Sequence, residues 1–567
     1  MPTTTEQLSR PRFWAPSTIG HRFLLPVFLG MLVVACHKAP PEAATERTAP
    51  LLEGMGNLHH SVTADNALAQ RFFDQGLTLA FGFNHWEAER SFREVARLDP
   101  DCAMAYWGIA LVLGPNINAA MEDEAVPKAY RAIQQALKRT PRASAKEQAY
   151  IQALAKRYAP EPVADRKPLD RAYAEAMGEV AQRYPDDADA AALYAEALMD
   201  LHPWDYWEKD GRPKPWTPKI LRVLESGLQR WPEHPGLNHF YIHAVEASAH
   251  PERALPSADR LLHLVPGIGH LVHMPGHIYI RTGRYADVVT ANELAIEADK
   301  RYLNQSQAQG LYPIGYVPHN QHFLSAAAAM AGMSEKAVSS ARQLASRQDP
   351  ALMREPGYGT LQHYFMIPLY AMVRFGQWDP ILREPAPEPD LLYPTGVWHF
   401  ARGMAYARSG HLDQADRSLA QLRTIAADTD LRQITIWEIN TTYELLQIAT
   451  EVLAGEIAAK RGNYGEAVDH LRNAVRLEDR LTYDEPPPWY FPARHNLGAV
   501  LLEADRAAEA ETVYREDLAK YPKNGWSLYG LHLSLAKQGK TQEAEAVKRR
   551  FAKAWAQADV RLTTSRF

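Results

Sequence analysis

Nine of the chain's 22 histidines lie between His239 and His322. Neutral imidazole is the commonest protein ligand for zinc, copper, iron and nickel. His239 and His243 are spaced i, i+4, so a helix would present both side chains on one face. Such a pair can hold one metal ion from a single helical turn. The spacing therefore indicates a metal site in this part of the chain.

The histidines also recur in phase along the sequence. Separations of 34 residues relate His239 to His273 and His243 to His277, and separations of 49 residues relate His270 to His319 and His273 to His322. A period of 34 residues is typical of stacked helix-turn-helix units, and 49 is that period plus an insertion of 15. Histidines that follow such a period lie on one face of the stack.

Small and large apolar residues mark the units themselves. Gly76 is followed twelve positions later by Ala88 and then by Phe92, and this unit closes at Asp99 and Pro100. Two helices approach closely only where both carry small side chains, and the large residue fills the next groove. The spacing resembles that of the tetratricopeptide-repeat (TPR) family. Further copies begin at Gly403, Gly455 and Gly498.

This resemblance implies an all-α fold, a TPR-like α-solenoid of about eleven helix-turn-helix units. No stretch shows sustained period-2 alternation, so we expect almost no sheet. We predict an N-terminal array over residues 57–350, which contains the histidines, and a C-terminal array over 351–567. Three regions do not fit the period, and we expect each to insert a helix or a loop: 115–185, 203–218 and 425–450.

In TPR arrays the first helix of each unit lines the concave wall, and the resemblance places the candidate residues there. We predict that seven histidines bind a divalent transition metal, namely zinc, copper or iron: His239, His243, His270, His273, His277, His319 and His322. Glu246 is predicted as a catalytic base or a further ligand. Glu196, Asp200 and His363 are predicted to support the ligands or to line the same groove.

Two prolines bear on the geometry of the ligands. Proline inside a helix removes a backbone hydrogen bond. Pro275 therefore predicts a helix start or a kink between His273 and His277, and either would disturb the i, i+4 spacing. Pro318 is a natural first-turn residue, so His319 and His322 are expected on the opening turn of a regular helix.

The sequence leaves other interpretations of the histidines open. They could line a groove for a peptide or an anion, or serve only as core residues copied from repeat to repeat. If the protein is an enzyme, metal-dependent hydrolysis or oxygenase-type chemistry is expected, but no motif fixes the reaction. The alternative is a scaffold that binds a protein or peptide partner of the cell envelope without metal.

Several other classes of function lack support. The net charge is −5 and no basic run is present, so we expect no nucleic-acid partner. The chain has no Walker-type loop and no GxGxxG, so we expect no nucleotide. It also has no Gly-x-Ser-x-Gly elbow for a serine nucleophile.

The N-terminus predicts export and a lipid anchor. Arg10, Arg12 and Arg22 precede an apolar run of 13 residues that ends at Ala35, typical of a signal peptide and too short for a spanning helix. Val33-Val34-Ala35-Cys36 resembles a bacterial lipobox, which implies cleavage of residues 1–35 and lipidation of Cys36. Residues 36–56 are predicted as a flexible tether. We expect anchoring in the bacterial cell envelope, at the outer membrane and facing the periplasm.

A narrower resemblance supports this assignment. The segments GFNHWEAERSF, LDPDCAMAYWGIALVLGPN, LVHMPGHIY and PHNQHFL are similar to those of a group of bacterial TPR lipoproteins. That resemblance implies a fold and a location, but no reaction.

Overall fold

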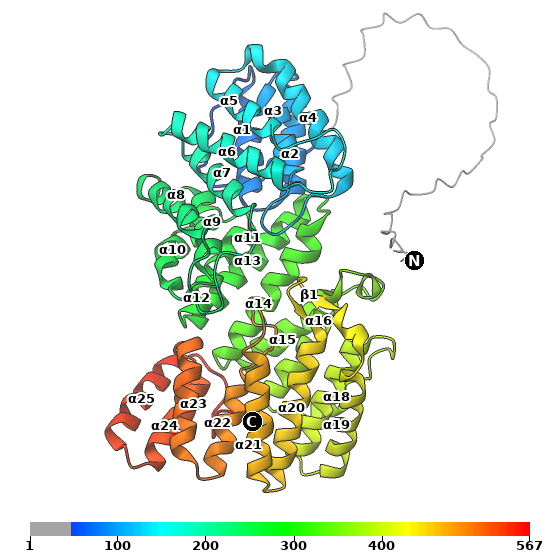
Figure 1. Ribbon diagram of the computed structural model, residues 1–567, viewed down its shortest axis with the longest axis vertical. Helices are drawn as coiled ribbons and strands as arrows, with labels where there is room; N and C mark the ends of the chain where they lie inside the picture. The colour runs from blue at the N-terminus through cyan, green and yellow to red at the C-terminus, as the bar shows by residue number, and fades with distance from the viewer. Residues whose placement is uncertain (1–46) are drawn as a thin grey trace, which may run out of the picture. The chain divides into compact units, whose positions relative to one another are not determined.

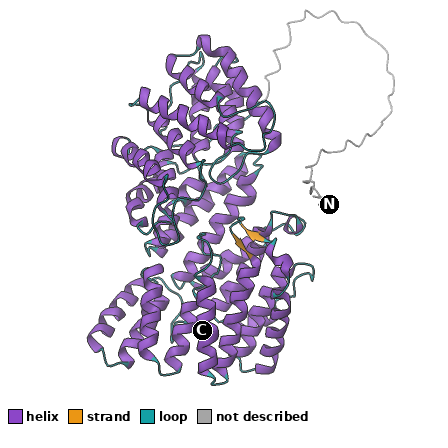
Figure 2. Cartoon of the chain, in the orientation of Figure 1, coloured by secondary structure: helices purple, strands orange, loops and turns teal. Residues whose placement is uncertain are grey.

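The structure is a computed structural model that describes residues 47–567, which form one compact unit. The unit is almost entirely helical (Figures 1 and 2). The only strands in residues 47–567 are β1 (Thr435–Ile436) and β2 (Asn440–Thr441), which pair antiparallel with Ile436 opposite Asn440. The predicted signal peptide, Cys36 and the first part of the predicted tether lie outside the described residues. No helix of residues 47–567 combines the length and the apolar content of a membrane span.

Consecutive helices pack as hairpins along the chain. The helices of the first half are α1 (Ala67–Phe81), α2 (His85–Leu98), α3 (Ala103–Val112), α4 (Val126–Arg139), α5 (Ala145–Ala155), α6 (Lys167–Arg183), α7 (Ala188–Met199), α8 (Thr217–Arg230), α9 (Pro235–Val245), α10 (Leu255–Leu264), α11 (Gly269–His273), α12 (Pro275–Arg281) and α13 (Tyr285–Gln305). Those of the second half are α14 (Val317–Met330), α15 (Ser334–Ala345), α16 (Gly359–Arg374), α17 (Trp378–Arg383), α18 (Leu392–Arg408), α19 (Leu412–Ala426), α20 (Thr442–Lys460), α21 (Tyr464–Glu478), α22 (Ala493–Glu503), α23 (Ala507–Lys520), α24 (Gly525–Lys537) and α25 (Thr541–Ala554).

Close approach within a hairpin depends on the small residues that the sequence singled out. A Cβ on Gly76 of α1 would lie 2.8 Å from the ring of Phe92 in α2. A Cβ on Gly455 of α20 would lie 2.7 Å from Leu471 of α21. Ala88 and Ala467 are both fully buried between their helices. The predicted TPR-like α-solenoid is thereby confirmed.

The three regions outside the repeat period contain extra elements. Residues 115–185 hold a loop and the helices α4 to α6. In residues 203–218 a flap packs on the end of α9, where the Trp207 indole donates to the Ala244 carbonyl over 2.8 Å. Residues 425–450 contain the β1–β2 hairpin before α20.

The end of the predicted tether is not free. The Thr48 amide donates to Glu94 over 2.9 Å, and the Leu52 amide donates to Gln75 over 2.7 Å. The Gly54 carbonyl accepts from the Gly267 amide over 2.8 Å. In residues 48–54 of the predicted tether, backbone groups thus have partners in α1, α2 and the α10–α11 turn.

The last residues of the chain lie inside the C-terminal half. The Ser565 hydroxyl donates to the His495 carbonyl over 2.7 Å and is also 2.7 Å from the Tyr514 hydroxyl. Arg566 forms an ion pair with Glu456 over 2.9 Å, and both side chains are buried. This segment, residues 562–567, is called the C-terminal tail below.

Candidate metal centre

Helix α9 presents two buried imidazoles whose tautomers are fixed by their surroundings. His239 Nδ1 donates to the Phe81 carbonyl over 2.6 Å, and His243 Nδ1 donates to Glu246 over 3.0 Å. A neutral imidazole has one donor and one acceptor nitrogen, so Nε2 of each ring is unprotonated and carries the lone pair. His243 Nε2 has no hydrogen-bond partner.

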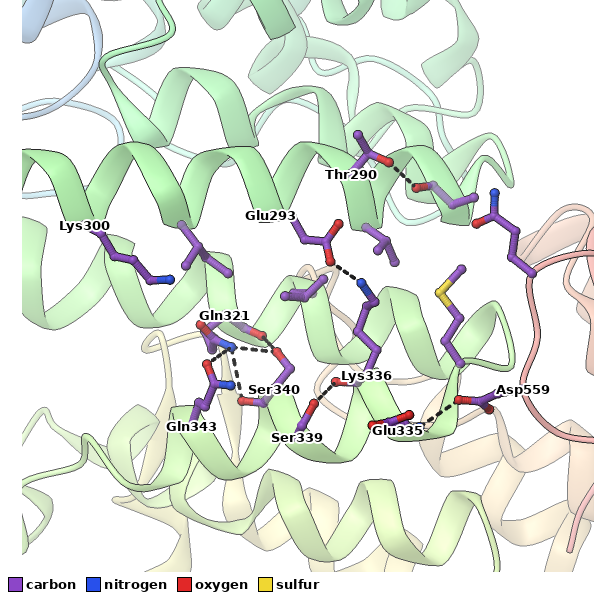
Figure 3. A pocket seen from close by; sticks show the side chains of 16 residues that line it. Thr290, Glu293, Lys300, Gln321, Glu335, Lys336, Ser339, Ser340, Gln343 and Asp559 are labelled. Carbon is purple, nitrogen blue, oxygen red and sulfur yellow. Dashed lines mark hydrogen bonds and ion pairs between the residues drawn. The ribbon is translucent and has the colours of Figure 1, made fainter. Parts of the chain in front are cut away.

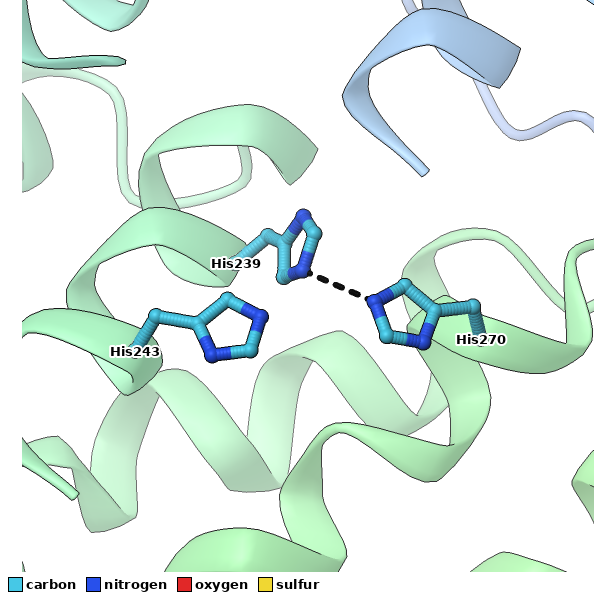
Figure 4. Close-up of side chains that lie close together, drawn as sticks. All are labelled: His239, His243 and His270. Atoms are coloured by element: carbon cyan, nitrogen blue, oxygen red, sulfur yellow. Dashed lines mark hydrogen bonds between the residues drawn. The ribbon is translucent and has the colours of Figure 1, made fainter. Parts of the chain in front are cut away.

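His270 of α11 completes a first group of three imidazoles. Its Nε2 atom lies 3.2 Å from Nε2 of His239, and one nitrogen from each of the three rings lies within 4.8 Å of the others (Figure 4). The Phe83 ring packs over His239 with centroids 4.6 Å apart, which keeps that side of the group apolar. We call His239, His243 and His270 the first triad.

A second group lies beside it and consists of His273, His277 and His319, the second triad. His273 Nδ1 donates to the Asn292 side-chain oxygen over 2.7 Å. The same amide donates its nitrogen to the Val288 carbonyl over 2.9 Å, which orients the oxygen toward the imidazole. Nε2 of His273 lies 3.0 Å from Nε2 of His277. His319 Nδ1 is buried without a partner.

The chain between His273 and His277 is kinked, as Pro275 predicts. Helix α11 ends at His273 and α12 begins at Pro275, with Met274 between them at φ −49° and ψ −36°. The kink does not separate the imidazoles, because the two Nε2 atoms still face each other. Pro318 lies in the first turn of α14, as expected, but a π-helical turn (Tyr312–Tyr316) precedes that helix. Such turns occur often at functional sites.

Glu246 lies between the two triads. One carboxylate oxygen is 3.0 Å from His243 Nδ1 and the other is 2.5 Å from His277 Nδ1. Burial alone would raise the pKa of Glu246, but His277 and His243 lower it to about 2. Burial alone would lower the pKa of His277, but Glu246 and Glu485 raise it to about 10. With both oxygens engaged, Glu246 is better placed to orient the two imidazoles than to act as the predicted base.

The other imidazoles of the triads are neutral at physiological pH, so each has a nitrogen lone pair that can bind a metal. Burial lowers the pKa of His243, and burial together with neighbouring histidines lowers the pKa of the others well below 6.5: His239, His270, His273 and His319. Metal ligation requires the neutral ring, so burial prepares these side chains for a cation.

Both triads border a cavity of about 430 Å³. His243 and His270 of the first triad and His277 and His319 of the second line its wall. Four loops supply much of the remaining lining: residues 115–121, 203–204, 437–439 and 483–485. Further lining residues are Arg166, Asp170, Asp200, Glu246, Leu311, Gly315 and Tyr316. The cavity gives a small molecule access to both groups of imidazoles.

Backbone strain is concentrated around this cavity. Six non-glycine residues of the described chain have positive φ, and four of them contact or line the site: Phe83, Trp204, Trp437 and Glu438. Trp204 at φ 60° packs edge-on against His243, with centroids 5.2 Å apart. Such conformations cost roughly 1–3 kcal/mol each and cluster at binding sites.

Some predicted site residues are not part of the triads. His322 lies beside His363 instead, with ring centroids 5.5 Å apart, and His363 Nδ1 hydrogen-bonds to the Tyr393 hydroxyl over 2.8 Å. Asp200 lines the cavity and forms an ion pair with Arg157 over 2.5 Å. Glu196 borders a separate small hollow with Arg157 and contacts neither triad.

The sequence did not point to three groups that hold the imidazoles in place. Asn292 belongs to the second helix of its hairpin, outside the histidine phase. The Phe81 carbonyl is a backbone group at the end of α1. Glu485, 3.6 Å from His277, comes from a proline-rich loop more than 200 residues downstream. Only the run Asp484-Glu485-Pro486-Pro487-Pro488 could have drawn attention to that loop.

A second hollow of about 740 Å³ lies between α13, α14 and α15 (Figure 3). Its side chains pair mainly with one another: Gln321 donates to the Ser340 hydroxyl over 2.8 Å, and Lys336 forms an ion pair with Glu293. Asp559 accepts from the Ser334 amide over 2.6 Å at the rim. This hollow is open and polar, and it holds no cluster of imidazoles.

Comparison with known proteins adds little beyond the fold. No protein-family model matches the chain, and no curated protein matches it. Similar solved structures include the human IFIT1 dimer with m7Gppp-AAAA, at 11% identity and a TM-score of 0.29 over 87% of this chain and 92% of that chain. Others are the APC/C Cut9–Hcn1 hetero-tetramer, at 11% identity and a TM-score of 0.29 over 87% and 74%, and Ypp1, at 7% identity and a TM-score of 0.41 over 87% and 82%. With these TM-scores, the fold assignment depends on the helix pairing within this chain.

Proposed function

We propose that this TPR-like solenoid binds a transition-metal ion through the first triad. The observation that carries the proposal is the convergence of His239, His243 and His270, buried side chains with one nitrogen each within 4.8 Å of the others. In two of them the second nitrogen is already engaged, so the lone pairs that converge have few alternative partners. Zinc, copper and iron all accept such neutral nitrogen donors.

The spacing fits a cation of this class. Ligand nitrogens on a tetrahedral zinc ion, at bonds of about 2.0–2.1 Å, lie about 3.3 Å apart. The Nε2 atoms of His239 and His270 are 3.2 Å apart. Three protein ligands would leave one coordination position open. Two of the three, His243 and His270, line the cavity. A metal at such a site can activate water or bind an oxygen donor, which supports hydrolysis or oxygen chemistry.

An explanation from packing alone accounts less well for these contacts. Each buried polar atom without a partner costs about 1–3 kcal/mol. Three imidazole nitrogens of the two triads have neither a hydrogen-bond nor an ion-pair partner: Nε2 of His243, Nδ1 of His270 and Nδ1 of His319. A bound cation would compensate for part of this cost. Asp200, whose pKa burial raises to about 6, lines the same cavity and could accept a proton near neutral pH.

The test is the metal content of the full-length protein after purification without added metal. We expect close to one equivalent or more of zinc, copper or iron, and a more than tenfold loss in the double variant His239→Ala/His243→Ala. Circular dichroism should show unchanged helicity, and His363→Ala serves as the matched buried control with normal metal content. Less than about a tenth of an equivalent in the wild-type protein would exclude this proposal.

A second candidate function is binding of an envelope protein or peptide, and the open hollow between α13 and α15 favours it. The hollow is large enough for an extended peptide, and its polar lining could hydrogen-bond to a peptide backbone. Capture of a partner that survives His239→Ala/His243→Ala and is lost on Lys336→Glu would favour this candidate. Capture that survives Lys336→Glu would oppose a role for the hollow.

We also propose the envelope location indicated by the signal peptide and Cys36. The support is the sequence of residues 1–36. Metabolic labelling with a radioactive fatty acid should mark the wild-type protein, and Cys36→Ser should abolish the label. A labelled Cys36→Ser variant, or an unlabelled wild type, would disprove lipidation at this residue.

A further inference from the structure

We propose that the second triad holds a second metal ion, so that the centre takes two ions per chain. This inference rests on the proposed function and extends it from one ion to an adjacent pair. The observation behind it is separate from that for the first triad, because His273, His277 and His319 are different side chains that form a group of their own. They come from α11, α12 and α14, whereas the first triad comes from α9 and α11.

In the second triad, two of the three imidazoles already have one nitrogen engaged by a neighbouring side chain. His273 Nδ1 is engaged by Asn292, and His277 Nδ1 lies 2.5 Å from Glu246. With both Nδ1 atoms occupied, the two Nε2 atoms face each other over 3.0 Å and are the atoms left to bind a cation. A proton on one of them can bridge the gap as an N–H···N hydrogen bond, and a metal ion could take its place with release of that proton to solvent. Such an ion would bind both Nε2 atoms at once, and the nearby nitrogen of His319 offers a third ligand.

The two triads are close enough to act as one centre. Ring centroids of His243 and His277 are 5.9 Å apart, and those of His270 and His273 are 6.0 Å apart. Glu246 contacts both triads, with one oxygen toward His243 and the other toward His277. A carboxylate that hydrogen-bonds to a ligand of each ion would fix both rings and offset part of the charge of two cations. Glu485 adds a second buried carboxylate 3.6 Å from His277.

Both ions would face the same cavity. His243 and His270 line it on the side of the first triad, and His277 and His319 line it on the side of the second. A small oxygen donor that enters the cavity could therefore contact both ions at once. Paired metal sites stabilise an attacking and a leaving oxygen together, which a single ion does less well. The inferred ligand class is thus a small oxygen donor that spans two ions.

The experiment loads the full-length protein, stripped by a chelator, with cobalt(II) as the probe. Equilibrium dialysis should give about two equivalents per chain in the wild type and about one in each triad variant, His239→Ala/His243→Ala and His273→Ala/His319→Ala. His363→Ala should keep two. Electron paramagnetic resonance should show coupled cobalt ions in the wild type and uncoupled ions in both triad variants.

The outcomes separate this inference from the proposed function. One equivalent in the wild type, lost with the first triad and kept without the second, overturns the pair and leaves the single-ion site standing. No bound cobalt in the wild type overturns both. His319→Asn provides a milder variant in case the double substitution fails to fold, because His319 is partly exposed on the first turn of α14. It should lower the second equivalent at least tenfold in affinity, and an unchanged second equivalent would count against the pair.

Discussion

The six histidines of the two triads, on α9 to α14, are called the histidine wall below. This wall and the C-terminal region of α20 to α25 bury polar side chains in contrasting ways. In the C-terminal region unlike groups face each other: His495 donates to Asp517 over 3.0 Å, and Arg566 pairs with Glu456 over 2.9 Å. In the histidine wall like groups face each other, with imidazole opposite imidazole at 3.2 and 3.0 Å. Both regions are built from the same helical hairpins. The C-terminal contacts pair groups of opposite charge within the chain, whereas the histidine wall brings together side chains that could share a cation.

The largest expected effect concerns the C-terminal region and its tail. Arg566→Ala leaves Glu456 fully buried without its closest cation, and breaking such a pair costs about 3–5 kcal/mol. We expect the lower end of that range, because Asn496 still donates to Glu456 over 2.8 Å. Urea unfolding followed by circular dichroism measures the loss. Metal content should stay normal, and a parallel loss of metal would mean that the two regions are not independent.

Gly269, the first residue of α11, precedes His270 and is packed against Asp299. A Cβ on Gly269 would lie 2.0 Å from Asp299 Oδ1, and this carboxylate accepts from Tyr312 over 2.9 Å. The Tyr312 hydroxyl in turn accepts from the His270 amide over 3.0 Å. Gly269→Ala should therefore destabilise the protein by about 1–3 kcal/mol through overpacking and weaken metal binding together.

Gly310→Ala is the matched control for Gly269→Ala, because no atom lies within 4 Å of a Cβ at that position. Its positive φ of 75° adds some strain, but it should leave metal affinity unchanged. A metal affinity that Gly269→Ala does not alter would show that the α11 start does not position His270.

A smaller effect is expected from the carboxylate between the triads. Glu246→Gln keeps the shape of the side chain but removes the negative charge beside His243 and His277. Loss of such an orienting partner lowers metal affinity about 10- to 100-fold, or about 1.4–2.7 kcal/mol. Isothermal titration with zinc measures the change. Asp517→Asn makes the same replacement beside His495 and should leave zinc affinity unaltered.

The smallest effect is a pH dependence in the C-terminal region. Burial alone would raise the pKa of Asp517, but His495, Ser527 and Asn524 hold it below its usual value. Because the folded pKa is lowered, the contribution is present above the unfolded pKa of about 3.9 and is lost as pH falls through the folded value. The free-energy difference between wild type and Asp517→Asn should therefore shrink below about pH 4, by about 1.4 kcal/mol for each unit of lowering. Urea midpoints between pH 3 and 6 would show it, and a constant difference would contradict it.

The fold was accessible from the sequence because small residues at fixed spacing determine where two helices can touch. Gly76, Gly455 and their partners have the contacts that the spacing predicted. The same period placed the histidines on the first helices of consecutive hairpins, and the structure has them on α9, α11, α12 and α14. Periodicity thus predicted which side chains share a wall.

The sequence period did not predict how those histidines divide into two triads. His270 and His273 both lie on α11, with ring centroids 6.0 Å apart, but they fall into different triads. His322 belongs by phase to the same set, but its position one turn further along α14 brings it to His363. Partners such as Asn292 and Glu485 lie outside the repeat phase. Their contacts follow from tertiary packing, which a period along the chain does not encode.

The loop that carries Glu485 has a consequence for the order in which the protein is made. A nascent chain that has emerged as far as Met330 already contains all six imidazoles of the two triads, but not Trp437, Glu438 or residues 483–485, which line the cavity. If the centre binds ions as proposed, the triads would be more open to them before these segments are in place. In the folded chain the late segments form part of the cavity wall, so an ion of the proposed centre would exchange through that cavity.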